Sequence, residues 1–180
     1  DIIEFDHNGA TLDLNPFEVE TFHVTHSIPE AQMLIIKTGA GKILHTGDWT
    51  FNDDIPIEAQ TDFTRLAEIG SDPKLLACMC DSTNSSRQTK QVTETQVRDT
   101  LTEIMKNAPG RVIVTGYSRS LARIKMFAEA ARNAGRIAAI KERSNPNPVP
   151  YVGLPEFREM GIKLGYLSKD DVYTHGEIKD

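Results

Sequence analysis

Apolar and polar residues alternate along the first quarter of the chain, in short runs separated by turn-forming residues. Residues 3–5, 10–14 and 17–24 alternate with period two, and Asn8-Gly9 and Asn15-Pro16 lie between them. Two further apolar runs, 33–38 and 42–46, flank the tight connection Gly39-Ala40-Gly41. The pattern predicts an antiparallel meander of about five strands.

The pattern changes twice further along the chain. Residues 61–70 have helical spacing and end at Gly70, which we expect to adopt a left-handed cap. Residues 74–80 are almost continuously apolar, which is typical of a strand buried on both faces. The polar segment 85–91 then follows, and we place a domain boundary there.

Beyond this boundary, helices and strands are predicted in alternation. We expect helices at 93–108, 121–133 and 156–164, with Thr93 and Gln96 forming a capping box, and buried strands at 111–115 and 136–141. Such alternation predicts a small parallel, Rossmann-like layer. The fold class is therefore α/β, with an α+β sandwich layer in residues 1–84 and an α/β layer in residues 85–180.

Charge is distributed unevenly along a chain whose net charge is −6. Residues 1–84 carry four basic and fifteen acidic side chains, whereas residues 111–143 carry eight basic and two acidic ones. This asymmetry suggests a cation site in the first part and a polyanion surface in the second, although a solvated helix face would give the same count. No apolar run approaches the roughly 20 residues of a membrane helix, so we expect no membrane association.

The two cysteines indicate in which cellular compartment we expect the protein. Cys78 and Cys80 lie two positions apart in an apolar run, a poor geometry for a disulfide, so we expect reduced core thiols and a cytoplasmic protein. The sequence begins Asp1-Ile2-Ile3, without an initiator Met or a signal pattern, and we expect it to be an internal piece of a longer chain.

Three residues that follow predicted strands are candidates for a metal-dependent site. His26 precedes the hairpin 33–46 and Asp48 follows it, so both should emerge at one end of the sheet. An imidazole and a carboxylate there suit a borderline metal such as zinc, although on spacing alone such residues more often cap turns. Asp81 directly follows the strand 74–80, and on local evidence a residue in this position more often caps the next segment.

The turn 115–120 between a strand and a helix is a candidate phosphate site. A strand that runs through Gly116 into a helix beginning near Ser118 presents free backbone N–H groups, which can bind phosphate. A plain helix cap explains the same residues equally well on local evidence. The dinucleotide-binding and Walker glycine patterns are both absent from the sequence.

Three short motifs carry a family resemblance. They are His26-Ser27-Ile28-Pro29-Glu30, His45-Thr46-Gly47-Asp48-Trp49 and Cys80-Asp81-Ser82-Thr83-Asn84. In order and spacing they resemble the ribonuclease J family, in the β-CASP branch of the metallo-β-lactamase superfamily. The resemblance implies a partial metallo-β-lactamase domain in residues 1–84 and a partial, Rossmann-like β-CASP domain in residues 85–180.

The resemblance also implies roles for the candidate residues. His26 and Asp48 would be zinc ligands, with Asp48 bridging the two ions of the complete enzyme, and Asp81 would support the catalytic site. Ser118, Arg119, Ser120 and Arg123 correspond to a turn and helix that contact the RNA backbone in the family, but Arg119 and Ser120 replace the usual Ser-Asn pair.

The predicted function is that of a fragment of a zinc-dependent ribonuclease that binds RNA and could form a homo-oligomer. The His-x-His-x-Asp-His motif of the family is absent from these residues and would precede Asp1. A zinc site needs three or four protein ligands, so we expect this piece alone to be inactive and to bind metal poorly. Two alternatives stay open: a non-catalytic RNA-processing scaffold of the same family, and a small-molecule metallohydrolase of the superfamily.

Overall fold

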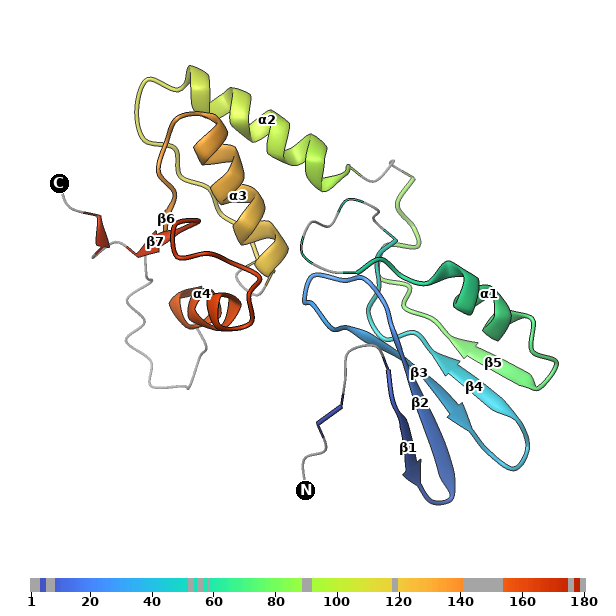
Figure 1. Cartoon of the computed structure of the whole chain (residues 1–180). Helices are drawn as coiled ribbons and strands as arrows, with labels where there is room; N and C mark the ends of the chain where they lie inside the picture. Colours follow the sequence, from blue (N-terminus) through green and yellow to red (C-terminus); the bar gives the residue numbers. More distant parts are fainter. Residues whose placement is uncertain are drawn as a thin grey trace, which may run out of the picture. The chain divides into compact units, whose positions relative to one another are not determined.

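The structure is a computed structural model of the chain, and it divides into two compact units, residues 1–90 and 91–180 (Figure 1). It describes residues 4–5, 9–51, 54, 57, 59–88, 92–117, 120–140, 154–174 and 177–178. Helices and strands are mixed, which confirms the α/β class. The boundary between the units lies within the polar segment 85–91.

The first unit is built on a five-stranded sheet. Its strands are β1 (Thr11–Leu14), β2 (Phe17–His23), β3 (Gln32–Lys37), β4 (Lys42–His45) and β5 (Leu75–Met79), in that order across the sheet. The first four pair antiparallel, which confirms the predicted meander for residues 11–45, whereas β5 pairs parallel with β4. The fifth strand is therefore β5 and not the predicted run 3–5, of which residues 4–5 are not in a strand.

The hairpin of β3 and β4 is closed by the predicted glycine turn. Thr38 donates its N–H to the carbonyl oxygen of Gly41 at 2.8 Å, and its hydroxyl donates to the same oxygen at 3.0 Å. Gly41 has φ +150°, and a Cβ at this position would lie 2.7 Å from the carbonyl oxygen of Lys74. Only glycine therefore fits this turn beside the start of β5.

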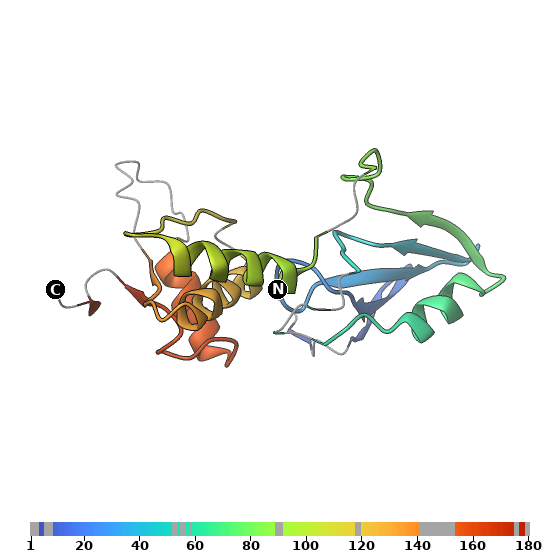
Figure 2. The same ribbon diagram turned by 90° about the horizontal axis from the view of Figure 1, so that it is seen from above.

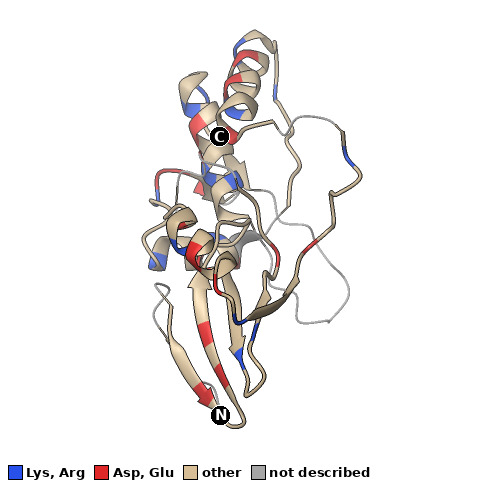
Figure 3. Ribbon diagram, turned by 90° about the vertical axis from the view of Figure 1, so that its right-hand side faces the viewer, with Lys and Arg blue, Asp and Glu red and all other residues tan. Residues whose placement is uncertain are grey.

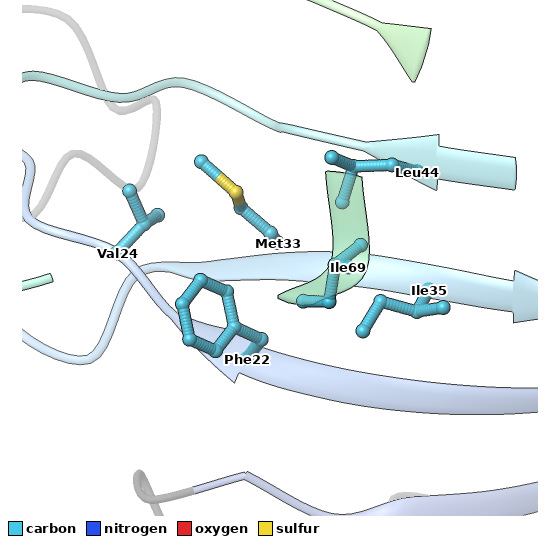
Figure 4. Close-up of a cluster of buried hydrophobic side chains, with 6 residues drawn as sticks. All are labelled: Phe22, Val24, Met33, Ile35, Leu44 and Ile69. Carbon is cyan, nitrogen blue, oxygen red and sulfur yellow. The ribbon is translucent and has the colours of Figure 1, made fainter. Parts of the chain in front are cut away.

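The core of the first unit lies between the sheet and helix α1 (Phe63–Gly70). Figure 4 shows its buried side chains, which are Phe22, Val24, Met33, Ile35, Leu44 and Ile69. Figure 2 shows α1 along one face of the sheet. The Asp62 carboxylate accepts the Arg65 N–H at 2.9 Å and starts this helix. The predicted left-handed cap at Gly70 is wrong: Gly70 is helical, and Ser71 closes the helix with a φ of −89°.

Strand β5 is present where the sequence predicted it, but its predicted burial is wrong. Leu76 is 61% exposed and Met79 is 56% exposed. Within the described residues, β5 is the last strand of the sheet and pairs only with β4, so much of its surface faces solvent. Cys78 and Cys80 are consequently free, exposed thiols and not core residues.

Two packed helices form the centre of the second unit. Helix α2 (Glu94–Asn107) begins at the predicted capping box of Thr93 and Gln96, which is confirmed. Helix α3 (Leu121–Asn133) packs against it, and Met105, Ala130 and Ala131 are buried between them. The third helix, α4 (Leu154–Lys163), starts two residues before the predicted one. No helix in the described part of the chain is long and apolar enough to span a bilayer.

The predicted strand layer of this unit is only partly present. Residues 111–115 form no strand, and Ile113 is 96% exposed, so the prediction of a buried strand there is wrong. Val112 and Val114 instead pack on the cluster between α2 and α3. The predicted strand 136–141 shrinks, within the described residues, to β6 (Ala139–Ile140), which pairs parallel with β7 (Tyr173–Thr174), a strand that the sequence pattern did not predict.

The two-unit organisation predicts where a protease cuts first. We expect trypsin to cleave after Arg87 or Lys90, before it cleaves after Lys125 within α3, because few contacts cross a boundary between compact units. Mass spectrometry of a time course measures the order of the cuts. Early cleavage after Lys125 with residues 85–91 intact would contradict the division.

Candidate functional site at one edge of the first sheet

The sheet topology brings the ends of three strands to one edge. Strands β2 and β4 both pair antiparallel with β3, and β5 runs parallel to β4, so β2, β4 and β5 all point the same way. Each is followed within three residues by a candidate side chain: His26 after β2, Asp48 after β4 and Asp81 after β5. The carboxyl ends of strands that run in the same direction meet at one edge of a sheet, where sites are commonly built.

Hydrogen bonds join the turns that carry these residues. Beyond β4, the Thr46 N–H donates to the carbonyl oxygen of Met79 at 3.0 Å, and the Thr46 hydroxyl accepts the Asp81 N–H at 3.0 Å. The Thr50 N–H donates to the carbonyl oxygen of Thr25 at 2.8 Å. The segment that carries Asp48 is therefore hydrogen-bonded on one side to Thr25, the neighbour of His26. On the other side it is hydrogen-bonded to Met79 and Asp81.

Asp81 is half-buried, and its surroundings stabilise the ionised form of its carboxylate. Its carboxylate accepts the Thr83 hydroxyl at 2.6 Å and the Thr83 N–H at 2.9 Å. These bonds, with a smaller contribution from the positive charge of His26, hold the pKa of Asp81 below its usual value. Asp81 is therefore ionised at neutral pH.

His26 and Asp48 differ in exposure. His26 is half-buried, and its Nδ1 lies 3.2 Å from the Ser27 hydroxyl oxygen. Asp48 is exposed and follows Gly47, whose φ of +55° is a left-handed conformation. The Gly47 N–H donates to His45 Nδ1 at 3.0 Å, so His45 supports the turn before Asp48. The sequence analysis did not single out His45, although it lies in the same motif.

His23 lies in β2 and has a different environment. Its Nε2 is 2.9 Å from the carbonyl oxygen of Ala59, on the segment that leads into α1. This bond ties β2 to that segment, which is a structural role for His23.

The edge has metal-binding chemistry but not a complete set of ligands. Imidazole nitrogen and carboxylate oxygen are donors that zinc accepts. Among the residues that the structure describes, however, no group of three or more His, Cys, Asp and Glu side chains could hold a metal ion. The donor types thus fit a metal, but these residues do not suffice for one on their own.

The second candidate region begins at helix α3. Ser118 and Arg119 lie outside the described residues. Ser120 is buried and caps the helix by accepting the Arg123 N–H at 3.3 Å. The Arg123 guanidinium forms an ion pair with Glu94 of α2 at 2.5 Å, so this side chain already has an anionic partner.

Other basic residues of the segment 111–143 are also bound within the fold. Arg132 forms an ion pair with Asp171, and Arg136 donates to the carbonyl oxygens of Gly110 at 2.7 Å and Ala108 at 2.5 Å. Figure 3 shows basic and acidic positions next to each other on the helices of this unit. The sequence count missed this compensation because Glu94 and Asp171 lie outside the counted segment.

Comparison with known proteins gives one consistent set of relatives. The chain is 37% identical to ribonuclease J of Sinorhizobium meliloti over 174 residues, which are 91% of this chain and 30% of that protein. It is 34% identical to ribonuclease J of Thermus thermophilus and 37% identical to that of Mycolicibacterium smegmatis, over 91% and 86% of this chain. These matches cover 27% and 26% of the two relatives, so the chain spans less than a third of the length of the relatives named here.

A solved structure shows the same fold. The crystal structure of a protein of unknown function from Enterococcus faecalis V583 matches 98% of this chain, with a TM-score of 0.60 and 16% sequence identity. The match covers 42% of that chain. The search against family models gave no match.

Proposed function

We propose that this chain, which is a ribonuclease J-like segment, belongs to an RNA-processing ribonuclease that hydrolyses RNA phosphodiester bonds. The observation that carries the proposal is similarity to ribonucleases J over about nine tenths of the chain. The similarity implies a metallo-β-lactamase fold, and we assign the first unit to part of that domain and the second unit to part of a β-CASP domain.

In this proposal, the edge beyond β2, β4 and β5 is part of the catalytic site. His26 and Asp48 would hold the metal through imidazole nitrogen and carboxylate oxygen, and Asp81 would support the site as a fixed negative charge. The remaining ligands must come from residues other than those described here, because the described residues form no group of three. Bound zinc would lower the pKa of a water molecule and offset charge on the phosphate.

Two further proposals concern the location and the oligomeric state of the parent protein. The exposed thiols of Cys78 and Cys80 suit a reducing compartment, and we propose a cytoplasmic location for the parent protein. We also retain the expectation that the parent could form a homo-oligomer. Sedimentation of the full-length protein measures its oligomeric state.

The direct test is hydrolysis of a single-stranded RNA by the full-length protein. The expected result is metal-dependent cleavage that a chelator abolishes and added zinc restores. Binding of RNA without cleavage would favour the scaffold alternative. Cleavage of a small-molecule ester in the absence of RNA cleavage would favour the metallohydrolase.

We propose that the start of α3 contributes to RNA binding through Ser118, Arg119, Ser120 and Arg123. The N-terminal end of a helix carries partial positive charge, and arginine forks bind phosphate oxygens. Arg123 is already paired with Glu94, so contact with phosphate would require exchange of that partner. We therefore expect Arg119 to contribute more than Arg123.

The salt dependence of RNA binding tests this assignment. Arg119→Ala in the full-length protein should flatten the slope of log K against log salt by about 0.7, the value for one phosphate contact on a single strand. Arg123→Ala should change the slope less. The matched control is Arg98→Ala, an ion-paired arginine of α2 outside the basic segment, which should leave the slope unchanged. A slope unaffected by Arg119→Ala would remove the start of α3 from the RNA path.

A further inference from the structure

We propose that two buried threonines, Thr25 and Thr46, are positioning residues that hold Asp48 between the turns of His26 and Asp81. This inference rests on the proposed function of the same edge and adds residues to it. Thr25 is 1% exposed and Thr46 is 5% exposed. Each is one or two residues from a candidate side chain in the sequence.

Thr46 joins the turn of Asp48 to the turn of Asp81. Its hydroxyl accepts the Asp81 N–H at 3.0 Å and donates to the carbonyl oxygen of Gly47 at 2.9 Å. Its own N–H donates to the carbonyl oxygen of Met79 at 3.0 Å. Thr46 directly follows His45, the last residue of β4 that pairs with β5, so this bond continues the pairing by one residue. A hydroxyl can donate and accept at once, and here both capacities are used.

Thr25 joins the turn of His26 to the far end of the Asp48 segment. Its hydroxyl donates to the carbonyl oxygen of Thr50 at 2.5 Å, and its carbonyl oxygen accepts the Thr50 N–H at 2.8 Å. The Thr25 N–H donates to the Thr61 hydroxyl at 3.0 Å, and the two hydroxyl oxygens lie 3.0 Å apart. Thr61 is buried just before α1, so this network extends to the helix.

Together these bonds fix both ends of residues 46–50. Asp48 lies in the middle of that segment and is itself exposed, so its position depends on how the ends are held. A carboxylate that acts in a site must be held close to its productive geometry by supporting bonds. The two threonines supply those bonds without occupying the exposed edge.

The burial of hydroxyl groups here argues against a role in packing alone. Val24, the residue before Thr25, is fully buried, and valine has almost the same shape as threonine. A buried hydroxyl is costly unless it is hydrogen-bonded, so packing by itself would favour valine at both threonine positions. The hydroxyls of Thr25 and Thr46 are used instead to connect segments 25 and 35 residues apart in the chain.

The test compares Thr46→Val and Thr46→Ser in the full-length protein. Groups that orient metal ligands cost about 10–100-fold in metal affinity or activity when they are removed. We expect Thr46→Val to weaken zinc binding by that factor and to lower kcat while the KM for RNA stays unchanged. Thr46→Ser retains the hydroxyl and should restore most of the zinc affinity and most of kcat. Thr46→Ala and Thr25→Val should weaken zinc binding in the same direction, which keeps the test decisive if Thr46→Val does not fold.

The matched control is Thr102→Val. Thr102 is also a buried threonine, and its hydroxyl donates to the Arg98 carbonyl oxygen at 2.9 Å within α2, in the second unit. It should leave zinc affinity and kcat unchanged. Amide hydrogen exchange of Asp81 reports directly on the lost bond and should accelerate in Thr46→Val.

Two outcomes of these measurements distinguish a failure of the positioning role from a failure of the ribonuclease function. Faster exchange at Asp81 with zinc affinity equal to that of Thr102→Val would overturn the positioning role. An inactive wild-type protein that binds zinc, and loses affinity in Thr46→Val, would leave the positioning role intact and would contradict the ribonuclease function alone.

Discussion

Asp48→Asn in the full-length protein is expected to reduce RNA hydrolysis at least about a hundredfold, because loss of groups that merely orient metal ligands already costs about 10–100-fold. The amide keeps the shape of the carboxylate but removes its charge. Asp48 is exposed, so the variant should fold as the wild type does. Single-turnover cleavage of a labelled RNA measures the rate, and thermal unfolding checks the fold.

The matched control for this variant is Asp13→Asn. Asp13 is an exposed carboxylate on β1, the strand at the opposite side of the sheet from β5. It should leave the cleavage rate unchanged. Equal rates for the two variants would remove Asp48 from the catalytic site, and with it the proposed role of the edge beyond β4.

Met33→Ala should destabilise the first unit by about 2–5 kcal/mol, the usual cost of truncating a buried methionine. Met33 is 1% exposed and lies at the centre of the core between β2, β4 and α1 (Figure 4). Its truncation leaves a cavity that neighbouring side chains cannot fill completely. Urea unfolding followed by circular dichroism measures the free energy of unfolding.

Met79→Ala is the matched control for the core prediction. Met79 is a strand methionine of the same sheet but is 56% exposed, so its truncation should change the free energy of unfolding by no more than about 0.5 kcal/mol. A loss as large as that of Met33→Ala would show that β5 is covered in solution.

Features that depend on neighbouring residues were predictable from the sequence. The hairpin turn at Thr38 and Gly41 and the capping box of Thr93 and Gln96 are closed by hydrogen bonds that span only three residues. The meander of β1 to β4 follows from period-two patterning between turn signals. The motifs that contain His26, Asp48 and Asp81 also carried the family resemblance on their own.

Burial and strand pairing were not predictable in the same way. An apolar run such as 74–80 predicts a strand, but its burial depends on what lies on either side, and β5 pairs only with β4 among the described strands. Residues 111–115 have a strand-like composition, yet they form no ladder, because a strand also needs a partner backbone. The partner of β6 is β7, which is more than 30 residues away.

Charge balance along the sequence described the second unit incompletely. The segment 111–143, with its eight basic residues, predicted a positive surface. In the structure, however, Arg123 pairs with Glu94 and Arg132 pairs with Asp171. These acidic partners lie 29 and 39 residues away. Charges cancel according to distance in space, and sequence windows do not contain that distance.

The sequence by itself determined which residues could act in this protein and the strands that they follow. The predicted hairpin already placed His26 and Asp48 at one end of the sheet, and only the tertiary structure decided that β5 runs parallel to β4, which brings Asp81 to the same edge. It also decided that Thr25 and Thr46 are bonded between the turns that carry them. The physical reason is that side-chain chemistry is local, whereas strand direction and buried hydrogen bonds depend on segments that meet only when the whole sheet has formed.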